Sequence, residues 1–132
     1  MSVDTHSLVL KRHKVVIADD EPSVRLLVQA TIEGDDYELF TACDGDEAMR
    51  LIHEHQPSLV LLDVRMPGRT GLEILRKIKT DPDLKHTKVI LLTASAQVTE
   101  INAGMVAGAD FYLTKPFSPR DLLSKVDEAL LL

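Results

Sequence analysis

The sequence has little of several features that narrow the class of a protein. Its 132 residues include no tryptophan, two tyrosines, three phenylalanines and one cysteine. A lone cysteine cannot form an internal disulfide bond, and we expect Cys43 to be a small packed residue. No apolar run approaches the ~20 residues of a membrane-spanning helix, and the opening "MSVDTHSLVLKRHK" lacks the apolar core and cleavage site of a signal peptide. These absences favour a cytoplasmic protein without a membrane-spanning segment.

An excess of basic charge is also lacking. The chain has 15 lysines and arginines against 21 aspartates and glutamates, a formal net charge of -6. This balance disfavours broad contact with the phosphates of nucleic acid. The one basic cluster, "KRHK" at residues 11–14, is interpreted as a solvated lead-in to the first strand. We therefore expect this domain to bind neither nucleic acid nor a membrane.

What the sequence does contain is a regular alternation of two patterns. Short apolar runs predict strands, and stretches with apolar residues at helical spacing predict helices. The predicted strands are 14–18, 37–42, 58–63, 87–93 and 109–114; the predicted helices are 22–33, 44–56, 71–79, 96–108 and 119–132. Alternation implies parallel strands joined by right-handed crossovers, and apolar runs such as "LVLL" fit strands buried on both faces. We predict an α/β fold with a doubly wound five-stranded parallel sheet in residues 14–132, preceded by an extension, 1–13.

Charged and polar residues follow the strands of the predicted sheet. Asp19 and Asp20 follow the first strand, Asp63 ends the third, Thr93 ends the fourth and Lys115 follows the fifth. In parallel sheets the functional crevice lies beyond these carboxyl ends. Each residue alone has an ordinary explanation as a helix cap, a strand end or a surface lysine. Together, however, the carboxylates would raise one another's pKa unless a cation were present, and oxygen ligands suit Mg²⁺.

Four segments of this sequence resemble a known family. "VVIADDEP", "LVLLDVRMPG", "VILLTA" and "GADFYLTKPF" are similar to the receiver domain of bacterial two-component response regulators. The resemblance extends over nearly the whole chain, from about residue 14 to residue 131. It implies a flavodoxin-like fold with the strand order 2-1-3-4-5.

The resemblance also implies a role for each acidic residue. Asp63 would be the phosphoacceptor and would take its phosphoryl group from a sensor histidine kinase or a phosphotransfer protein. Asp20 would bind Mg²⁺ directly and Asp19 through water. Asp63 itself and the backbone carbonyl of Arg65 would complete the ligands from the protein. The protein would then be a switch in signal transduction or a phosphorelay, catalysing only its own phosphorylation and dephosphorylation.

The remaining positions of the resemblance concern the phosphoryl group and the output. Thr93 would donate a hydrogen bond to the phosphoryl group, Lys115 would pair with it, and the Lys115–Pro116 bond would be cis. Thr93 and Tyr112 would be switch residues that change the face formed by helix 96–108, strand 109–114 and the last helix. That face would control a downstream effector, a covalently linked output domain or a second copy of the chain. Whether the receiver stands alone or was excised from a longer protein stays open.

Two other functions remain as alternatives. A phosphatase acting through an aspartyl phosphate needs a general acid two residues after its nucleophile, where this chain has Arg65. A flavodoxin-like cofactor-binding module needs a phosphate-binding loop after the first strand, where this chain has the acidic, glycine-free "DDEPS". Turnover of a phosphomonoester would favour the first alternative, and the absorbance of a bound flavin would favour the second.

Overall fold

A computed structural model describes residues 12–34, 36–94 and 98–131. Within them, strands and helices alternate along the chain as the sequence predicts. The strands are β1 (His13–Ala18), β2 (Tyr37–Ala42), β3 (Leu59–Asp63), β4 (Lys88–Thr93) and β5 (Phe111–Thr114). The helices are α2 (Pro22–Ile32), α3 (Gly45–His55), α4 (Gly71–Thr80), α5 (Val98–Val106) and α6 (Pro119–Leu131). None of these described helices is long and apolar enough to cross a membrane.

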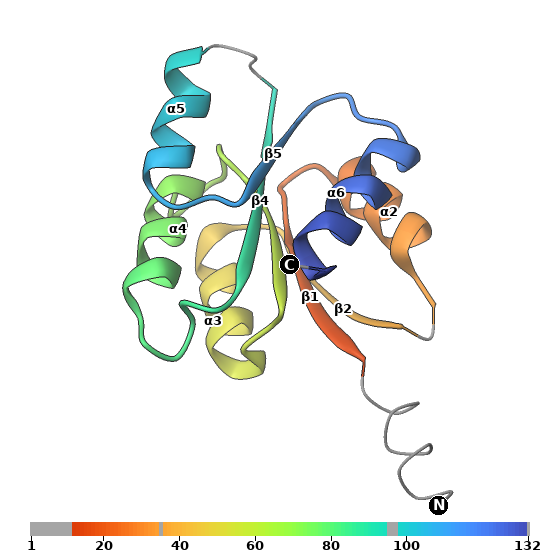
Figure 1. Cartoon of the computed structure of the whole chain (residues 1–132), viewed down its shortest axis with the longest axis horizontal. Coiled ribbons are helices and arrows are strands. Elements are labelled where there is room, and N and C mark those ends of the chain that lie inside the picture. The colour runs from red at the N-terminus through yellow and green to blue at the C-terminus, as the bar shows by residue number, and fades with distance from the viewer. Residues whose placement is uncertain (1–11, 35, 95–97, 132) are drawn as a thin grey trace, which may run out of the picture.

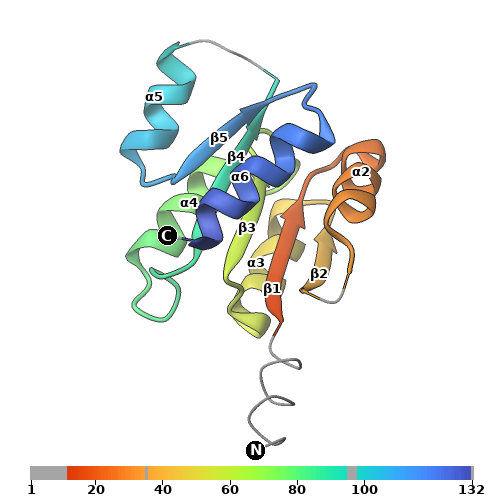
Figure 2. The ribbon, with the colours of Figure 1, turned by 45° about the vertical axis from the view of Figure 1, so that its right-hand side comes forward.

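The strands form one parallel sheet in the order β2-β1-β3-β4-β5, which confirms the predicted topology. β1 and β3 are neighbours, with Ala18 opposite Leu62 in the register. The chain therefore leaves β1 and β3 toward opposite sides, and a crevice opens between their carboxyl ends. Because all strands run the same way, these ends lie along one edge of the sheet, at the top of Figure 2.

Helices cover both faces of the sheet. In Figure 1, α2 and α6 lie on one side, and α3, α4 and α5 lie on the other. Each face has its own apolar core: Leu61 of β3 packs toward α2 and α6, whereas Val60 and Leu62 pack toward α3 and α4. Burying one such leucine side chain contributes about 1.5–3 kcal/mol. β3 is buried along its whole length, so the sheet fixes the position at which Asp63 emerges.

Side-chain caps determine where three of the helices begin. Asp44 accepts a hydrogen bond from the Glu47 N–H at the start of α3, and Ser118 Oγ accepts one from the Asp121 N–H at the start of α6. The pattern at 44–47 predicts a reciprocal capping box, but the Glu47 carboxylate instead accepts from the Cys43 N–H. A complete capping box occurs at α4, between Thr70 and Glu73.

A glycine inside α5 has a packing role. Helix α5 contains Gly104, and a Cβ at this position would overlap Leu91 Cδ1. The glycine thus allows α5 to pack closely against β4, at the expense of helix propensity.

Cys43 is exposed, so the prediction that it is packed was wrong: it follows β2 in a surface turn. Most of the predicted N-terminal extension, residues 1–11, lies outside the described residues, and β1 begins at His13.

Candidate functional site

The third strand delivers Asp63 to the carboxyl edge of the sheet. Asp63 is the last residue of β3, and its residue surface is only 5% exposed. The chain turns immediately afterwards, with Gly68 in the left-handed region at φ 79°. A Cβ on Gly71 would overlap the Asp63 carbonyl oxygen, so helix α4 begins directly against the end of β3. The turn therefore places the Asp63 end of the buried strand β3 at the edge of the sheet.

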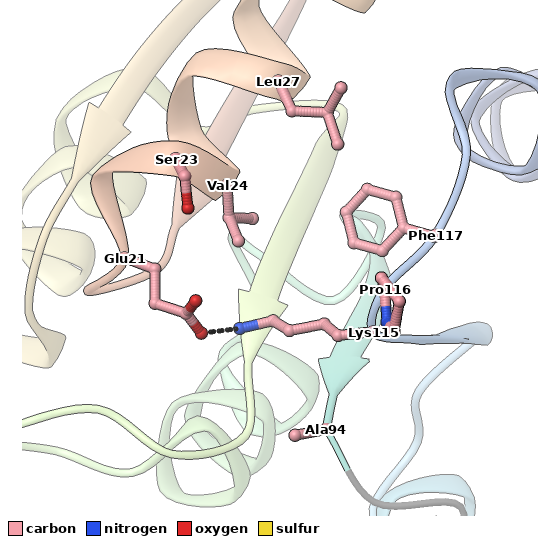
Figure 3. A pocket seen from close by; sticks show the side chains of 8 residues that line it. All are labelled: Glu21, Ser23, Val24, Leu27, Ala94, Lys115, Pro116 and Phe117. Carbon is pink, nitrogen blue, oxygen red and sulfur yellow. Dashed lines mark hydrogen bonds and ion pairs between the residues drawn. The ribbon is translucent and has the colours of Figure 1, made fainter.

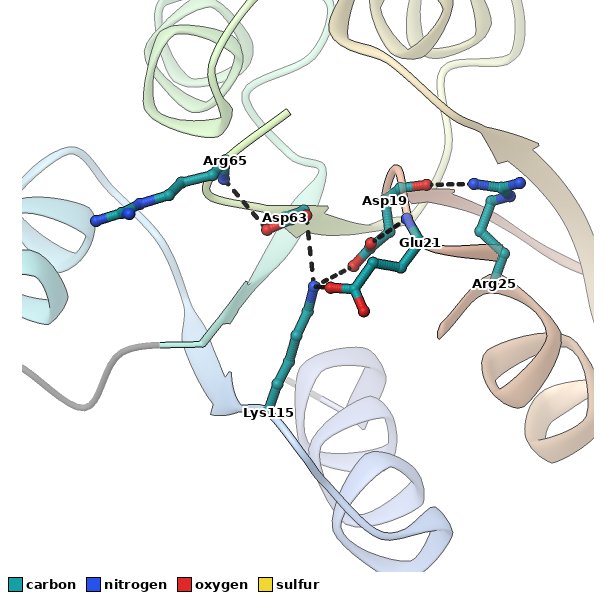
Figure 4. A network of polar contacts seen from close by, with 6 residues as sticks. All are labelled: Asp19, Glu21, Arg25, Asp63, Arg65 and Lys115. Atoms are coloured by element: carbon teal, nitrogen blue, oxygen red, sulfur yellow. Dashed lines mark hydrogen bonds and ion pairs between the residues drawn. The ribbon is translucent and has the colours of Figure 1, made fainter. Parts of the chain in front are cut away.

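Lys115 lies at the centre of the acidic residues. Its Nζ is 2.8 Å from Asp19 Oδ2, 3.1 Å from Glu21 Oε1 and 3.4 Å from Asp63 Oδ2. Figure 4 shows the lysine side chain reaching from the end of β5 to these three carboxylates. The side chains of Lys115, Asp19 and Asp63 are largely desolvated, whereas that of Glu21 is 56% exposed. The sheet therefore brings together Asp19, Asp63 and Lys115, which are far apart in the sequence.

The surroundings of Asp63 make its carboxyl group hard to ionise. Burial and the nearby Asp19 charge raise the pKa of Asp63, the Arg65 N–H and Lys115 lower it, and the result is about 6. For Lys115, burial lowers the pKa, but its contacts with Asp19, Glu21 and Asp63 outweigh burial and raise the pKa above its usual value. The Asp63 carboxyl group thus keeps its proton to a higher pH than an ordinary aspartate, beside a lysine that stays charged.

One oxygen in this crevice has an unusual environment. Asp19 is fully buried, and its Oδ1 accepts a hydrogen bond from the Glu21 N–H at 2.9 Å. Its Oδ2 is within 2.8 Å of the Lys115 ammonium, yet it accepts no well-oriented hydrogen bond. A buried carboxylate oxygen in this situation is well suited to a cation, because removing it from water is costly.

Among the described residues, one acidic group could hold a metal ion by geometry alone. Asp19, Asp20 and Glu21 each place one carboxylate oxygen within 4.8 Å of the others. Asp19 is buried, whereas Asp20 and Glu21 are exposed. Asp63 is outside this group but shares Lys115 with two of its members. These carboxylates are hard oxygen donors, so the residues present fit Mg²⁺.

The loop after β1 is held from several sides. The Asp19 N–H donates to the Ala42 carbonyl at the end of β2. Arg25 Nη1, one turn into α2, donates to the Asp19 carbonyl at 2.7 Å (Figure 4). In the separate loop after β3, the Arg65 N–H donates to Asp63 Oδ1 at 3.2 Å, and the Arg65 side chain points away from the crevice. Glu21 and Arg25 were not predicted as site residues, although both lie within six residues of Asp19.

Thr93 and Tyr112 lie on neighbouring strands. Thr93 ends β4 and is buried, one residue beyond Leu92, which lies opposite Asp63 in the register. Tyr112 lies opposite Leu91 and is 41% exposed. Thr93, Tyr112 and three apolar side chains line a cavity with only about 10 Å³ of accessible space. The structure therefore places the two predicted switch residues around one small void.

Beside Lys115 the surface is hollowed on the side of α2. The Lys115–Pro116 peptide bond is cis, and Phe117 follows it. Val24, Leu27 and Phe117 form the apolar wall of a pocket of about 450 Å³, shown in Figure 3. The Glu21–Lys115 ion pair lies at the border between this apolar pocket and the acidic crevice.

Comparison with known proteins agrees with this geometry. The family described as the response regulator receiver domain matches residues 15–127. A response regulator from Chloroflexus aurantiacus is 32% identical, with a TM-score of 0.86 over 92% of this chain and 100% of that chain. The chemotaxis response regulator CheY4 of Vibrio cholerae is 31% identical, with a TM-score of 0.84 over 90% and 99%. The Mn²⁺-bound form of the response regulator Rcp1 is 31% identical, with a TM-score of 0.75 over 88% and 90%.

A parallel sheet that gathers carboxylates and one lysine at its switch point defines a flavodoxin-like domain built around an acidic site. The sequence match and the solved structures specify the family further. The chain belongs to the response regulator receiver domains of two-component systems, which are phosphoacceptor switches in signalling. The resemblance noted from the sequence is thereby confirmed.

Proposed function

We propose that this protein is a cytoplasmic signalling switch whose Asp63 accepts a phosphoryl group from a sensor histidine kinase or a phosphotransfer protein. The observation that carries this proposal is the position of Asp63 at the end of a buried central strand, 3.4 Å from the ammonium of Lys115. A nucleophile and a fixed positive charge at this distance are what phosphoryl transfer requires, since the protein contributes mainly positioning and charge neutralisation.

The transfer step can be written from the groups present. One carboxylate oxygen of Asp63 forms a bond to phosphorus as the phosphorus–nitrogen bond of the donor phosphohistidine breaks. The bonding electron pair returns to the imidazole nitrogen, which takes up a proton from solvent. The product is a mixed anhydride of Asp63, and attack by water on its phosphorus releases inorganic phosphate and restores the carboxylate. Lys115 pairs with the phosphoryl oxygens, and Thr93 donates a hydrogen bond to one of them.

A divalent cation belongs to this proposal because of the local charge. Asp19, Asp20, Asp63 and the backbone carbonyl of Arg65 would hold Mg²⁺, and the ion would neutralise negative charge shared by these carboxylates and the incoming phosphoryl group. The buried Asp19 oxygen without a well-oriented hydrogen bond supports this assignment. The existence of a Mn²⁺-bound relative gives independent support for a divalent cation in the family.

The output is proposed to leave through the face made by α5, β5 and α6. This face carries large apolar side chains that are exposed: Met105, Val106, Tyr112 and Leu123. Such side chains suit a surface that a partner covers. The partner would be an effector protein, a linked output domain or a second copy of the chain. Thr93 and Tyr112 would connect this face to the phosphoryl group through the cavity that they share.

Intact mass spectrometry after incubation with acetyl phosphate and Mg²⁺ tests the assignment. The wild-type protein should gain one phosphoryl group, and Asp63→Asn should gain none. Asp83→Asn, which removes an exposed carboxylate in the turn after α4, is the matched control and should behave as wild type. Phosphoryl mass on Asp63→Asn, or equal phosphorylation in excess chelator, would contradict the proposal.

The phosphatase alternative predicts a different result. Arg65, two residues after Asp63, cannot act as the general acid of such an enzyme. The proposed switch therefore releases phosphate only from its own Asp63. Sustained hydrolysis of a phosphomonoester by the wild-type protein, lost in Asp63→Asn, would favour the phosphatase.

A further inference from the structure

Glu21 occupies a helix-capping position but does not cap the helix. It is the N-cap residue of α2, and its side chain makes no hydrogen bond to the backbone of that helix. Instead its Oε1 accepts a hydrogen bond from Lys115 Nζ at 3.1 Å, although the Glu21 side chain is 56% exposed. An exposed glutamate therefore engages the lysine that the proposed function assigns to the phosphoryl group.

The position of the ammonium shows which acids hold it in this state. Lys115 Nζ is closer to Asp19 and Glu21, at 2.8 and 3.1 Å, than to Asp63 at 3.4 Å. Asp19 is buried and its Oδ1 accepts a hydrogen bond from the Glu21 N–H, whereas the Glu21 side chain is 56% exposed and borders solvent. When Asp63 gains phosphoryl oxygens, Lys115 has to share its donors among more acceptors. Glu21 is then the partner that competes with the new group and can turn away into water.

We propose that Glu21 restrains the unphosphorylated protein, because its carboxylate competes with the phosphoryl group for the ammonium of Lys115. This inference rests on the proposed function and adds a residue that regulates the same site. It also gives Glu21 a second effect of the same sign. A carboxylate at the rim of the crevice repels an approaching anionic donor.

The size of the restraint follows from the exposure of Glu21. Exposed ion pairs contribute roughly 0.2–1 kcal/mol, which corresponds to a factor of about 1.4 to 5 in an equilibrium constant. Removing the Glu21 charge should therefore strengthen the binding of a phosphoryl mimic by up to about fivefold. The effect is large enough to measure and small enough to leave the fold intact.

The first experiment uses protein without metal and compares Glu21→Gln with a matched control. Glu33→Gln removes the same charge from the exposed residue at the opposite end of α2, about 18 Å away along the helix axis. The side-chain mobility of Lys115 is measured by ¹³C relaxation of its Cε, assigned by its loss in Lys115→Arg. We expect greater mobility in Glu21→Gln than in wild type or Glu33→Gln. Equal mobility in all three proteins would overturn the inference.

The second experiment measures beryllofluoride binding by amide NMR at saturating Mg²⁺. Each protein is first titrated with Mg²⁺ alone, because Glu21 belongs to the acidic group and its removal can weaken cation binding. At saturation, Glu21→Gln should bind the mimic about 1.4- to fivefold more tightly than wild type and Glu33→Gln. Unchanged or weaker binding in Glu21→Gln overturns the inference while leaving the proposed function intact. A wild-type protein that neither binds the mimic nor gains a phosphoryl mass would instead overturn the proposed function.

Discussion

The ionised carboxyl group of Asp63 lowers the stability of the folded protein. Burial comes first among the causes that raise its pKa from 3.8 to about 6, followed in the same direction by the Asp19 charge. The folded state therefore holds the Asp63 proton more tightly than the unfolded state does. As the pH rises from about 4 to about 6, the folded state loses stability on this account, and the loss is complete above that range. Asp63 therefore destabilises the folded state in its ionised form, which is the form that the proposed chemistry needs.

Replacing Asp63 by asparagine should remove this loss of stability. At pH 7 without divalent cations, we expect Asp63→Asn to increase the free energy of unfolding by on the order of 1–3 kcal/mol, since one pKa unit corresponds to 1.36 kcal/mol. The difference from wild type should shrink toward zero at pH 4, where both proteins carry an uncharged side chain. Urea unfolding at several pH values measures this. A difference that is independent of pH would contradict the assignment, and Asp83→Asn controls for the lost net charge.

Two glycines provide a second prediction for single residues. A Cβ on Gly71 would overlap backbone, the carbonyl oxygen of Asp63, whereas a Cβ on Gly104 would overlap only the end of the Leu91 side chain. Gly71→Ala should thus destabilise the protein by about 1–3 kcal/mol or more, because the start of α4 has to move. Gly104→Ala should cost much less, since Leu91 can change rotamer and alanine favours the helix by about 1 kcal/mol. Equal midpoints for the two variants in denaturant would refute this ranking.

At the level of elements, the loop between β1 and α2 depends on a residue outside it. Arg25 Nη1 donates to the carbonyl of Asp19, and this contact ties the first turn of α2 to the acidic loop. The guanidinium also opposes the negative charge of the loop, so its removal has two effects of opposite sign on cation binding. A substitution that keeps the charge separates them.

Arg25→Lys keeps the positive charge but loses the planar donor geometry. Since a hydrogen bond contributes about 0.5–1.5 kcal/mol, Mg²⁺ binding should weaken by about two- to tenfold. Calorimetric titration with Mg²⁺ gives the affinity. Arg50→Lys, which changes an exposed arginine paired with Glu54 on α3, serves as the control. An Arg25→Lys variant with wild-type affinity would show that this hydrogen bond does not organise the loop.

The sequence was sufficient for the strands but not for every helix boundary or contact. The run "SLVLL" before Asp63 has only one stable location, a strand buried on both faces, and the order of strands follows from the family resemblance. The proximity of Asp63 and Lys115 could be predicted because a lysine side chain is long enough to reach from β5 to the end of β3. The partners of Glu21 and Glu47 could not be predicted, because a long glutamate side chain can reach more than one hydrogen-bond donor; here Glu47 accepts from the Cys43 N–H and Glu21 from Lys115 Nζ. The exposure of Cys43 likewise depends on how the turn after β2 faces solvent.

Over the whole molecule, the proposed signal has to travel from Asp63 to the face of α5, β5 and α6. The cavity between Thr93, Tyr112 and Ile101 has about 10 Å³ of accessible space, which is far too small for an aromatic ring. Tyr112 can therefore turn inward only if Thr93 or helix α5 moves first. The arrangement favours two discrete states over a gradual change.

Amide NMR with and without beryllofluoride tests this coupling. In the wild-type protein we expect shifts that extend from Asp63 to residues around Tyr112 on β5. In Thr93→Ala the shifts near Asp63 should persist, while those around Tyr112 should be lost or much reduced. Shifts confined to the neighbourhood of Asp63 in the wild type, or distant shifts unchanged in Thr93→Ala, would contradict the coupling.

The beginning of β1 and the end of α6 lie together at the edge of the sheet opposite the acidic crevice. His13 and Leu131 line one shared hollow of about 310 Å³ there, together with Tyr37. Within the described part of the chain, the start of the first strand and the end of the last helix are therefore close in space. A short linker that replaces residues 1–11 and joins the end of α6 to β1, with new ends opened in the turn at residues 82–86, would give a circular permutant that begins at β4. In its sequence Thr93 and Lys115 would come before Asp19 and Asp63. It should still accept a phosphoryl group, because the reaction depends on how the folded sheet places these side chains at its carboxyl edge and not on their order in the sequence.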